Sequence, residues 1–195
     1  MSMVQVKEFG PPPVNEKEIL RYARCPRADE ATLSLMRQCL AEAEGGLVFR
    51  VCWETVPCHV EGKVCHLGAL DVASQDLARN LQGCREAVLF AATVGMGVDR
   101  LIRKYQRLSP AKAMMLQAVG AERVESLCDA FCDGLEESGR QWRPRFSPGY
   151  GDVSLAVQRD FFALLQCEKH LGIYLNESLL MSPSKSVTAF VGRME

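Results

Sequence analysis

The chain has 195 residues, of which 48% are hydrophobic and 24% charged, and its formal net charge is −1. This length and composition fit one globular domain with its own core. The small net charge argues against an overall basic field that would gather nucleic acid. No run of about 18 apolar residues could span a membrane, and the N-terminus lacks the basic and apolar regions of a signal peptide. We therefore expect a cytoplasmic protein that binds neither nucleic acid nor membrane.

Helical signals dominate the first 45 residues. Asn15 followed by Glu18 is typical of a capping box and predicts a short helix that runs through Tyr22. A second helix is expected to begin near Asp29, because an apolar stripe at helical spacing follows it, and to end at Gly45-Gly46.

The middle of the chain changes to an alternating pattern. Leu47, Phe49, Val51 and Trp53 alternate with other residues and predict a strand, and residues 60–64 predict a tight turn between paired strands. The remaining predicted elements are a helix capped by Ser74, an interior strand over 87–92, a helix over about 99–105, a long helix from Pro110, a helix from about 152 to His170, and a last strand over 187–191.

This mixture of elements predicts an α+β fold with a central antiparallel or mixed sheet flanked by helices. We expect a single domain over residues 1–195. Residues 1–45 form its helical N-terminal part, and residues 46–195 form its core, with a functional loop at 143–152.

Nine cysteines are many for this length. Their odd number, without an export signal, favours reduced thiols that pack as small apolar residues. Cys58-His59 and Cys65-His66 offer four zinc-type ligands. However, neighbouring residues on a strand point to opposite faces, so ordinary strand positions explain them better than a metal site.

Two further motifs have structural explanations that outweigh functional ones. Thr93 to Gly97 follows a predicted strand, as a nucleotide-binding turn would, but the full G-x-G-x-x-G is missing. A tight strand-to-helix connection explains it better, and a Rossmann-like methyltransferase is the minor hypothesis. Cys128 and Cys132 lie one helical turn apart, and packing beside a core stripe explains them better than redox or metal chemistry.

The loop 143–152 is the most informative segment for function. Arg145 offers a rigid fork that suits a carboxylate. Gly149 allows the backbone to approach a ligand closely, and Tyr150 adds an aromatic face with a polar tip. From composition alone, a structural loop with a surface arginine is favoured over a binding loop.

The segment from Arg145 to Tyr150 resembles the R-x-x-x-G-Y motif of the activation (reactivation) domain of cobalamin-dependent methionine synthase, in a short stand-alone form. The resemblance continues through 164–172 and 175–187 and extends upstream over 74–102. The first forty residues match loosely. In that family the loop binds S-adenosylmethionine.

The resemblance implies roles for five residues. Arg145 would pair with the carboxylate of S-adenosylmethionine, and Glu125 would meet its α-ammonium, the alternative being a solvated acid in mid-helix. Backbone at Phe146 and Gly149 would line the ligand. Tyr150 would close the site on the side that faces the cobalamin. The chain offers no confident counterpart of the family's N-terminal, adenosine-contacting aspartate.

The function implied is that of an S-adenosylmethionine-binding component of a split cobalamin-dependent methionine synthase. This methyltransferase component would support reductive methylation of cob(II)alamin on a separate corrinoid protein, with a flavodoxin-like or ferredoxin-like electron donor. It is not expected to make methionine alone. The alternatives are reactivation of another corrinoid methyltransferase, a non-catalytic module that binds S-adenosylmethionine or docks cobalamin, and an independent methyltransferase.

Overall fold

The computed structural model describes residues 3–136 and 141–194, so the outermost ends of the predicted domain lie outside the described residues. Its helices and strands are, in chain order, β1 (Gln5–Glu8), α1 (Glu16–Tyr22), α2 (Glu30–Glu44), β2 (Arg50–Glu61), β3 (Val64–Leu67), β4 (Leu70–Ala73), α3 (Gln75–Asn80), β5 (Cys84–Thr93), α4 (Gly97–Leu108), α5 (Pro110–Glu136), a short 3-10 helix η1 (Leu155–Val157), α6 (Gln158–Leu165), α7 (Cys167–Leu171), β6 (Tyr174–Leu175), β7 (Met181–Ser182) and β8 (Ser186–Met194).

A six-stranded antiparallel sheet forms the centre, in the order β4-β3-β2-β5-β8, with β1 also paired to β2. The first residues of the long strand β2 pair with β1, and its last residues pair with β3. β5 is buried without interruption from Ala87 to Thr93, as its apolar sequence predicts. The expected α+β fold with a central antiparallel sheet is therefore confirmed.

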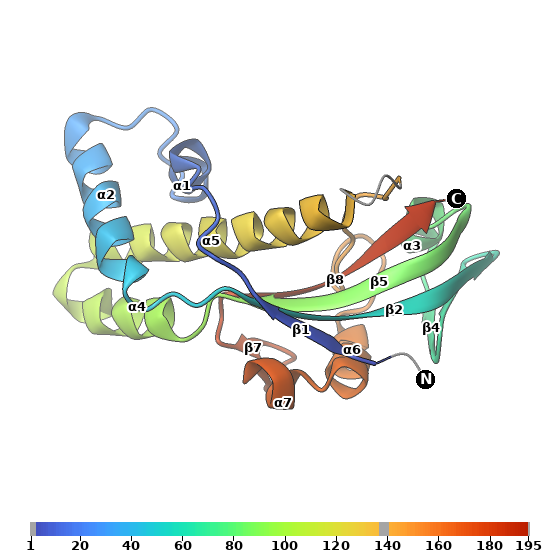
Figure 1. Cartoon of the computed structure of the whole chain (residues 1–195). Coiled ribbons are helices and arrows are strands. Elements are labelled where there is room, and N and C mark those ends of the chain that lie inside the picture. Colours follow the sequence, from blue (N-terminus) through green and yellow to red (C-terminus); the bar gives the residue numbers. More distant parts are fainter. Residues whose placement is uncertain (1–2, 137–140, 195) are drawn as a thin grey trace.

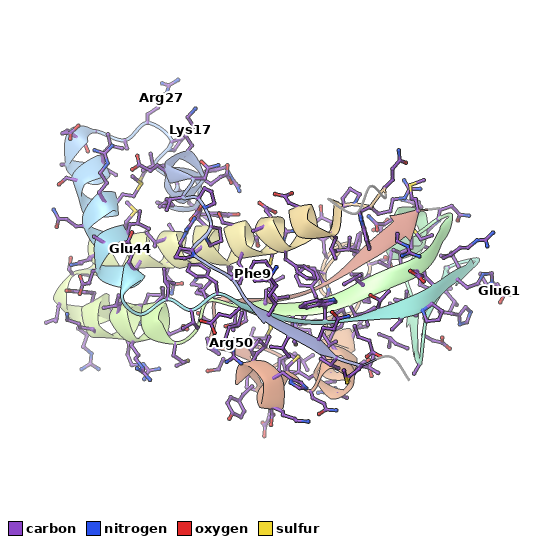
Figure 2. All side chains as sticks on the ribbon, in the orientation of Figure 1. Phe9, Lys17, Arg27, Glu44, Arg50 and Glu61 are labelled. Carbon is purple, nitrogen blue, oxygen red and sulfur yellow. The ribbon has the colours of Figure 1, made fainter. Side chains whose placement is uncertain are left out.

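Helices cover both faces of this sheet (Figure 1). On one face lies α5, whose Phe131 packs against Phe90 with ring centroids 4.8 Å apart. Figure 2 shows Phe9 on this same side, and its ring meets Phe131 edge-on. On the other face lies α6, whose Phe161 meets Phe190 at 4.7 Å. The two faces of β5 and β8 thus belong to separate apolar clusters.

The helices α1, α2 and α4 pack around the first half of α5, beyond the end of the sheet (Figure 1). The predicted cap at Asn15 is confirmed, since its side chain accepts the N–H of Glu18 at 3.3 Å. The second helix begins beside Asp29 as predicted, and Asp29 caps it by accepting the N–H of Thr32 at 2.9 Å. The N-terminal 45 residues also supply strand β1. Among the described helices, none combines the length and apolar character needed to cross a membrane.

A buried ion pair ties the segment before α1 to α5. Arg123 and Glu122 are 2% and 1% exposed, and their Nε and Oε2 atoms lie 2.6 Å apart. Arg123 also donates to the carbonyls of Pro12 and Pro13 at 2.7 and 2.8 Å, while Glu122 accepts the N–H of Asn15 at 2.8 Å. These bonds satisfy both buried charges and fix α1 beside α5.

The single helix expected from about 152 to His170 is wrong, because the structure divides it. Gln166 adopts a left-handed conformation with φ 47°, which ends α6 and starts α7 in a new direction. The change of direction lets Leu165 and Cys167 both be fully buried, which two such close residues of one straight helix could not achieve against one sheet. The last strand, β8, also extends beyond the predicted 187–191.

The close approach of Gly97 to the chain after α2 gives a test of the packing. A Cβ on Gly97 would lie 2.1 Å from the carbonyl oxygen of Gly46, and relief of this clash would require a backbone shift. We expect Gly97→Ala to lower the free energy of unfolding by about 1–3 kcal/mol in urea titrations. Gly134→Ala, where nothing lies within 4 Å, is the control and should raise it by about 0.5–1 kcal/mol. Equal stability of both variants would contradict this packing.

Candidate functional site

A cavity of about 780 Å³ opens beside the edge strand β8. This volume lies in the range of small-molecule sites, roughly 300–1,000 Å³. The walls come from α5, the segment 142–150, the start of α6, β7 and β8. The polar residues in these walls include Glu125, Arg145, Tyr150, Gln158, Ser186 and Thr188.

The edge of β8 is paired over only half of its length. Phe146 and Phe190 exchange both backbone hydrogen bonds, at 3.0 and 2.7 Å, and beyond Phe146 the chain turns away. Alternate residues of an antiparallel strand direct their N–H and C=O groups to the same side. Those of Thr188 and Ser186 therefore point toward the cavity, where no described backbone group bonds to them. The site contains free backbone donors and acceptors.

Hydrogen bonds within the loop fix its conformation where it leaves β8. The N–H of Tyr150 donates to the carbonyl of Ser147 at 3.1 Å, and the N–H of Gly149 donates to that of Val153 at 2.9 Å. Gly149 has φ 84°, which a residue with a side chain rarely adopts. The glycine of the motif is therefore needed for the turn.

Asp152 anchors the end of this loop to α3. Its carboxylate accepts the Ser74 hydroxyl and the N–H groups of Gln75 and Asp76, the latter two at 2.8 and 3.2 Å. The hydrogen bond from Ser74, followed by that from Gln75, lowers the pKa of Asp152 below its ordinary 3.8. Gly151, at φ 54°, leaves room for Asp76, which a Cβ would approach to 2.6 Å.

Arg145 forms a charge cluster with two acids of α5. Its Nη1 lies 3.0 Å from Glu125 Oε2 and its Nη2 lies 2.6 Å from Asp129 Oδ1. Burial lowers the pKa of Arg145, but the carboxylates of Glu125 and Asp129 outweigh the effect of burial and raise the pKa overall. The cluster carries a net charge of about −1, since two carboxylates face one guanidinium. It can bind an ammonium and a carboxylate side by side.

Tyr150 stands at the mouth of the cavity. The residue is 69% exposed, and its ring meets that of Phe146 edge-on at 5.3 Å. Phe146 itself is buried at 8% exposure and holds the loop against the core. Of the five predicted residues, Glu125, Arg145 and Tyr150 line the cavity. Phe146 and Gly149 belong to the same loop but are not among the residues that line it.

Sequence reasoning missed Asp129 and Gln158. Asp129 could have been found, because it lies four residues after Glu125 and so shares its helix face. Gln158 gave no signal, since an amide at the start of an amphipathic helix is ordinarily a surface residue. It is in fact 6% exposed and lines the cavity.

The Cys and His pairs of the β2–β3 hairpin do not converge. Cys58 and Cys65 are buried in the core, while the rings of His59 and His66 stack outside it with centroids 6.1 Å apart. In the parts of the chain that the structure describes, no group of three or more His, Cys, Asp and Glu could hold a metal ion. Cys58 and Cys65 are free thiols. Burial raises the pKa of the Cys128 thiol well above its ordinary value.

The glycines between β5 and α4 serve a tight connection. Gly95 has φ 79°, and a Cβ there would lie 2.6 Å from Val48 Cγ2. Its N–H donates to Thr93 Oγ1 at 3.1 Å. All strand pairs among the described residues are antiparallel, unlike the parallel sheet of a Rossmann fold.

The anchoring role of Asp152 predicts a pH-dependent contribution to stability. Because its pKa is lowered in the folded state, its contribution is present above the ordinary carboxyl pKa and is lost as pH falls through the folded-state value. We expect Asp152→Asn to lower the midpoint of thermal unfolding at neutral pH, and the difference from wild type to shrink toward about pH 3. Asp160→Asn, on exposed α6 surface, is the control. A difference independent of pH would contradict the assignment.

No protein-family model matches the chain. No curated protein matches it either. Among solved structures, it is similar to the crystal structure of the MetH reactivation domain bound to AdoHcy, with a TM-score of 0.68 and 16% sequence identity. The match covers 97% of this chain and 78% of that chain. At this identity the likeness shows the fold: a central antiparallel sheet flanked by helices, as in that domain.

Proposed function

We propose that the cavity beside β8 binds S-adenosylmethionine, and that the chain is the reactivation component of a cobalamin-dependent methionine synthase divided between polypeptides. The observation that carries the proposal is Arg145, which stands in an R-x-x-x-G-Y loop and lies at a cavity of suitable size. The neighbour of similar fold was solved with AdoHcy, which S-adenosylmethionine becomes when it loses its methyl group.

The charge cluster suits the amino-acid end of this ligand. The ligand carboxylate would take N–H groups of Arg145 that the bonds to Glu125 and Asp129 leave unused, and the ammonium would bind Glu125, the acid of the cluster that lines the cavity. Because the three side chains already contact one another, little reorganisation is needed. The free backbone at Thr188 and Ser186 offers further hydrogen bonds.

The exposed mouth of the cavity suits a second macromolecule. Tyr150 lines the cavity and is largely exposed to solvent, so it would lie between the bound ligand and a partner protein. The client would be the cobalamin-carrying subunit, and the reaction would be reductive methylation. One electron from a flavodoxin-like or ferredoxin-like donor reduces cob(II)alamin, S-adenosylmethionine transfers its methyl as a cation, and methylcob(III)alamin and S-adenosylhomocysteine result.

The residues of this chain would bind and orient rather than transfer protons. A methyl transfer from a sulfonium needs no general acid or base, so positioning is the protein's main contribution.

Calorimetry with S-adenosylmethionine and S-adenosylhomocysteine tests the binding step. We expect saturable binding to wild type, weakened by about 1.5–3 kcal/mol in Arg145→Ala, the range for a hydrogen bond to a charged group. Arg159→Ala, which removes an exposed guanidinium outside the cavity, should bind as wild type does. Absence of saturable binding at millimolar ligand would refute the proposal.

Methyl transfer with a corrinoid partner tests the client. Wild-type protein, a reductant and methyl-labelled S-adenosylmethionine are mixed with the cob(II)alamin form of a methionine synthase corrinoid subunit. We expect labelled methylcobalamin with wild type and at least tenfold slower formation with Arg145→Ala, consistent with the loss of about 1.4 kcal/mol or more. Methylation only of a corrinoid protein from another methyltransferase system would reassign the client. Methylation of a small acceptor without corrinoid would favour the independent methyltransferase.

A further inference from the structure

Gln158 is a buried polar side chain of the cavity that has no partner. It is 6% exposed, and its Oε1 atom accepts no hydrogen bond. Its amide nitrogen donates to no described residue either. A buried polar group without a partner lowers stability, so this position is unfavourable for folding alone. An amide held in this way is a candidate for ligand contact.

Gln158 lies on the opposite side of β8 from the charge cluster. It begins α6 and precedes Phe161 by three residues, so the two share the helix face that packs against Phe190. Arg145 instead reaches toward α5, on the other face of the sheet. Both nevertheless line one cavity, which continues past the half-paired edge of β8.

A ligand anchored at the cluster by its amino-acid end must pass the β8 edge to fill this cavity. The distance along β8 from Phe190 to Ser186 is about 13 Å, at about 3.3 Å per residue. The remaining end of S-adenosylmethionine is its adenosine. Gln158 is the buried amide on that side, and the nearby Ser186 hydroxyl already donates to Thr93 Oγ1.

We propose that Gln158 recognises the adenine base of the ligand. A carboxamide presents one acceptor and one donor side by side, which matches the N6 amino group and N7 of adenine, whereas hypoxanthine presents two acceptors on that edge. The inference rests on the proposed S-adenosylmethionine function and extends it to a residue outside the R-x-x-x-G-Y loop. It also supplies the adenosine contact for which the sequence offered no aspartate.

The experiment compares S-adenosylhomocysteine with S-inosylhomocysteine, in which a carbonyl replaces the adenine amino group. Calorimetry is carried out on wild type, Gln158→Met, Arg145→Ala and the surface control Gln106→Met. We expect wild type to prefer adenine by about tenfold or more, because a polar site left unpaired rejects the wrong base. Gln158→Met should bind both analogues alike. Arg145→Ala should weaken both and keep the preference, and Gln106→Met should match wild type.

Thermal unfolding separates recognition from a structural role. Methionine has nearly the shape of glutamine, and the amide has no described partner to lose, so Gln158→Met should unfold at or above the wild-type midpoint. A clearly lower midpoint would show a structural role and overturn the inference. Equal wild-type affinity for both analogues, or an unchanged preference in Gln158→Met, would overturn it while leaving the proposed function intact. Binding of neither analogue by wild type would overturn both.

Discussion

The site depends on the point at which the edge of β8 stops being paired. A free sheet edge normally invites another strand, and proteins cover it to prevent association. Here the segment 142–146 covers the second half of β8, and the loop then turns away at Ser147. The uncovered half lies recessed between α5 and α6, so the opening admits a small molecule more readily than a strand. This turn away from β8 places Arg145 just before it and Tyr150 just after it.

The α5 helix divides its acidic residues between structure and binding. Glu122 is buried in an ion pair with Arg123, and Arg123 holds Pro12 and Pro13 and thereby α1. Glu125 and Asp129, one and two turns farther along the same face, remain 38% and 64% exposed and hold Arg145. The buried bonds of Glu122 thus hold α5 in place and orient Glu125 and Asp129 on its next two turns. An arginine held by two carboxylates in advance loses little rotamer freedom when a ligand arrives.

Much of the fold could be predicted because local signals and burial agreed. The caps at Asn15 and Asp29, the apolar strand at 87–92 and the long helix from Pro110 each follow local rules. The break at Gln166 could not be predicted, because the apolar spacing continues across it and the sheet, which is distant in sequence, imposes it. The loop residues could be identified because their motif is local in the sequence. Gln158 could not, because its buried environment is created by β8, which is distant in the sequence.

The net charge of the Arg145 cluster at the cavity would distinguish the two ligands that the proposed reaction exchanges. S-adenosylmethionine carries an ammonium, a sulfonium and a carboxylate, so it has one net positive charge, whereas S-adenosylhomocysteine has none. A cluster of two carboxylates and one guanidinium favours the positively charged ligand. Because Glu125 and Asp129 are partly exposed, solvent screens this preference and keeps it small. Methyl transfer would thus weaken the attraction at Glu125 and Asp129 while leaving the neutral contact at Gln158 unchanged, so release of the product would begin from the amino-acid end.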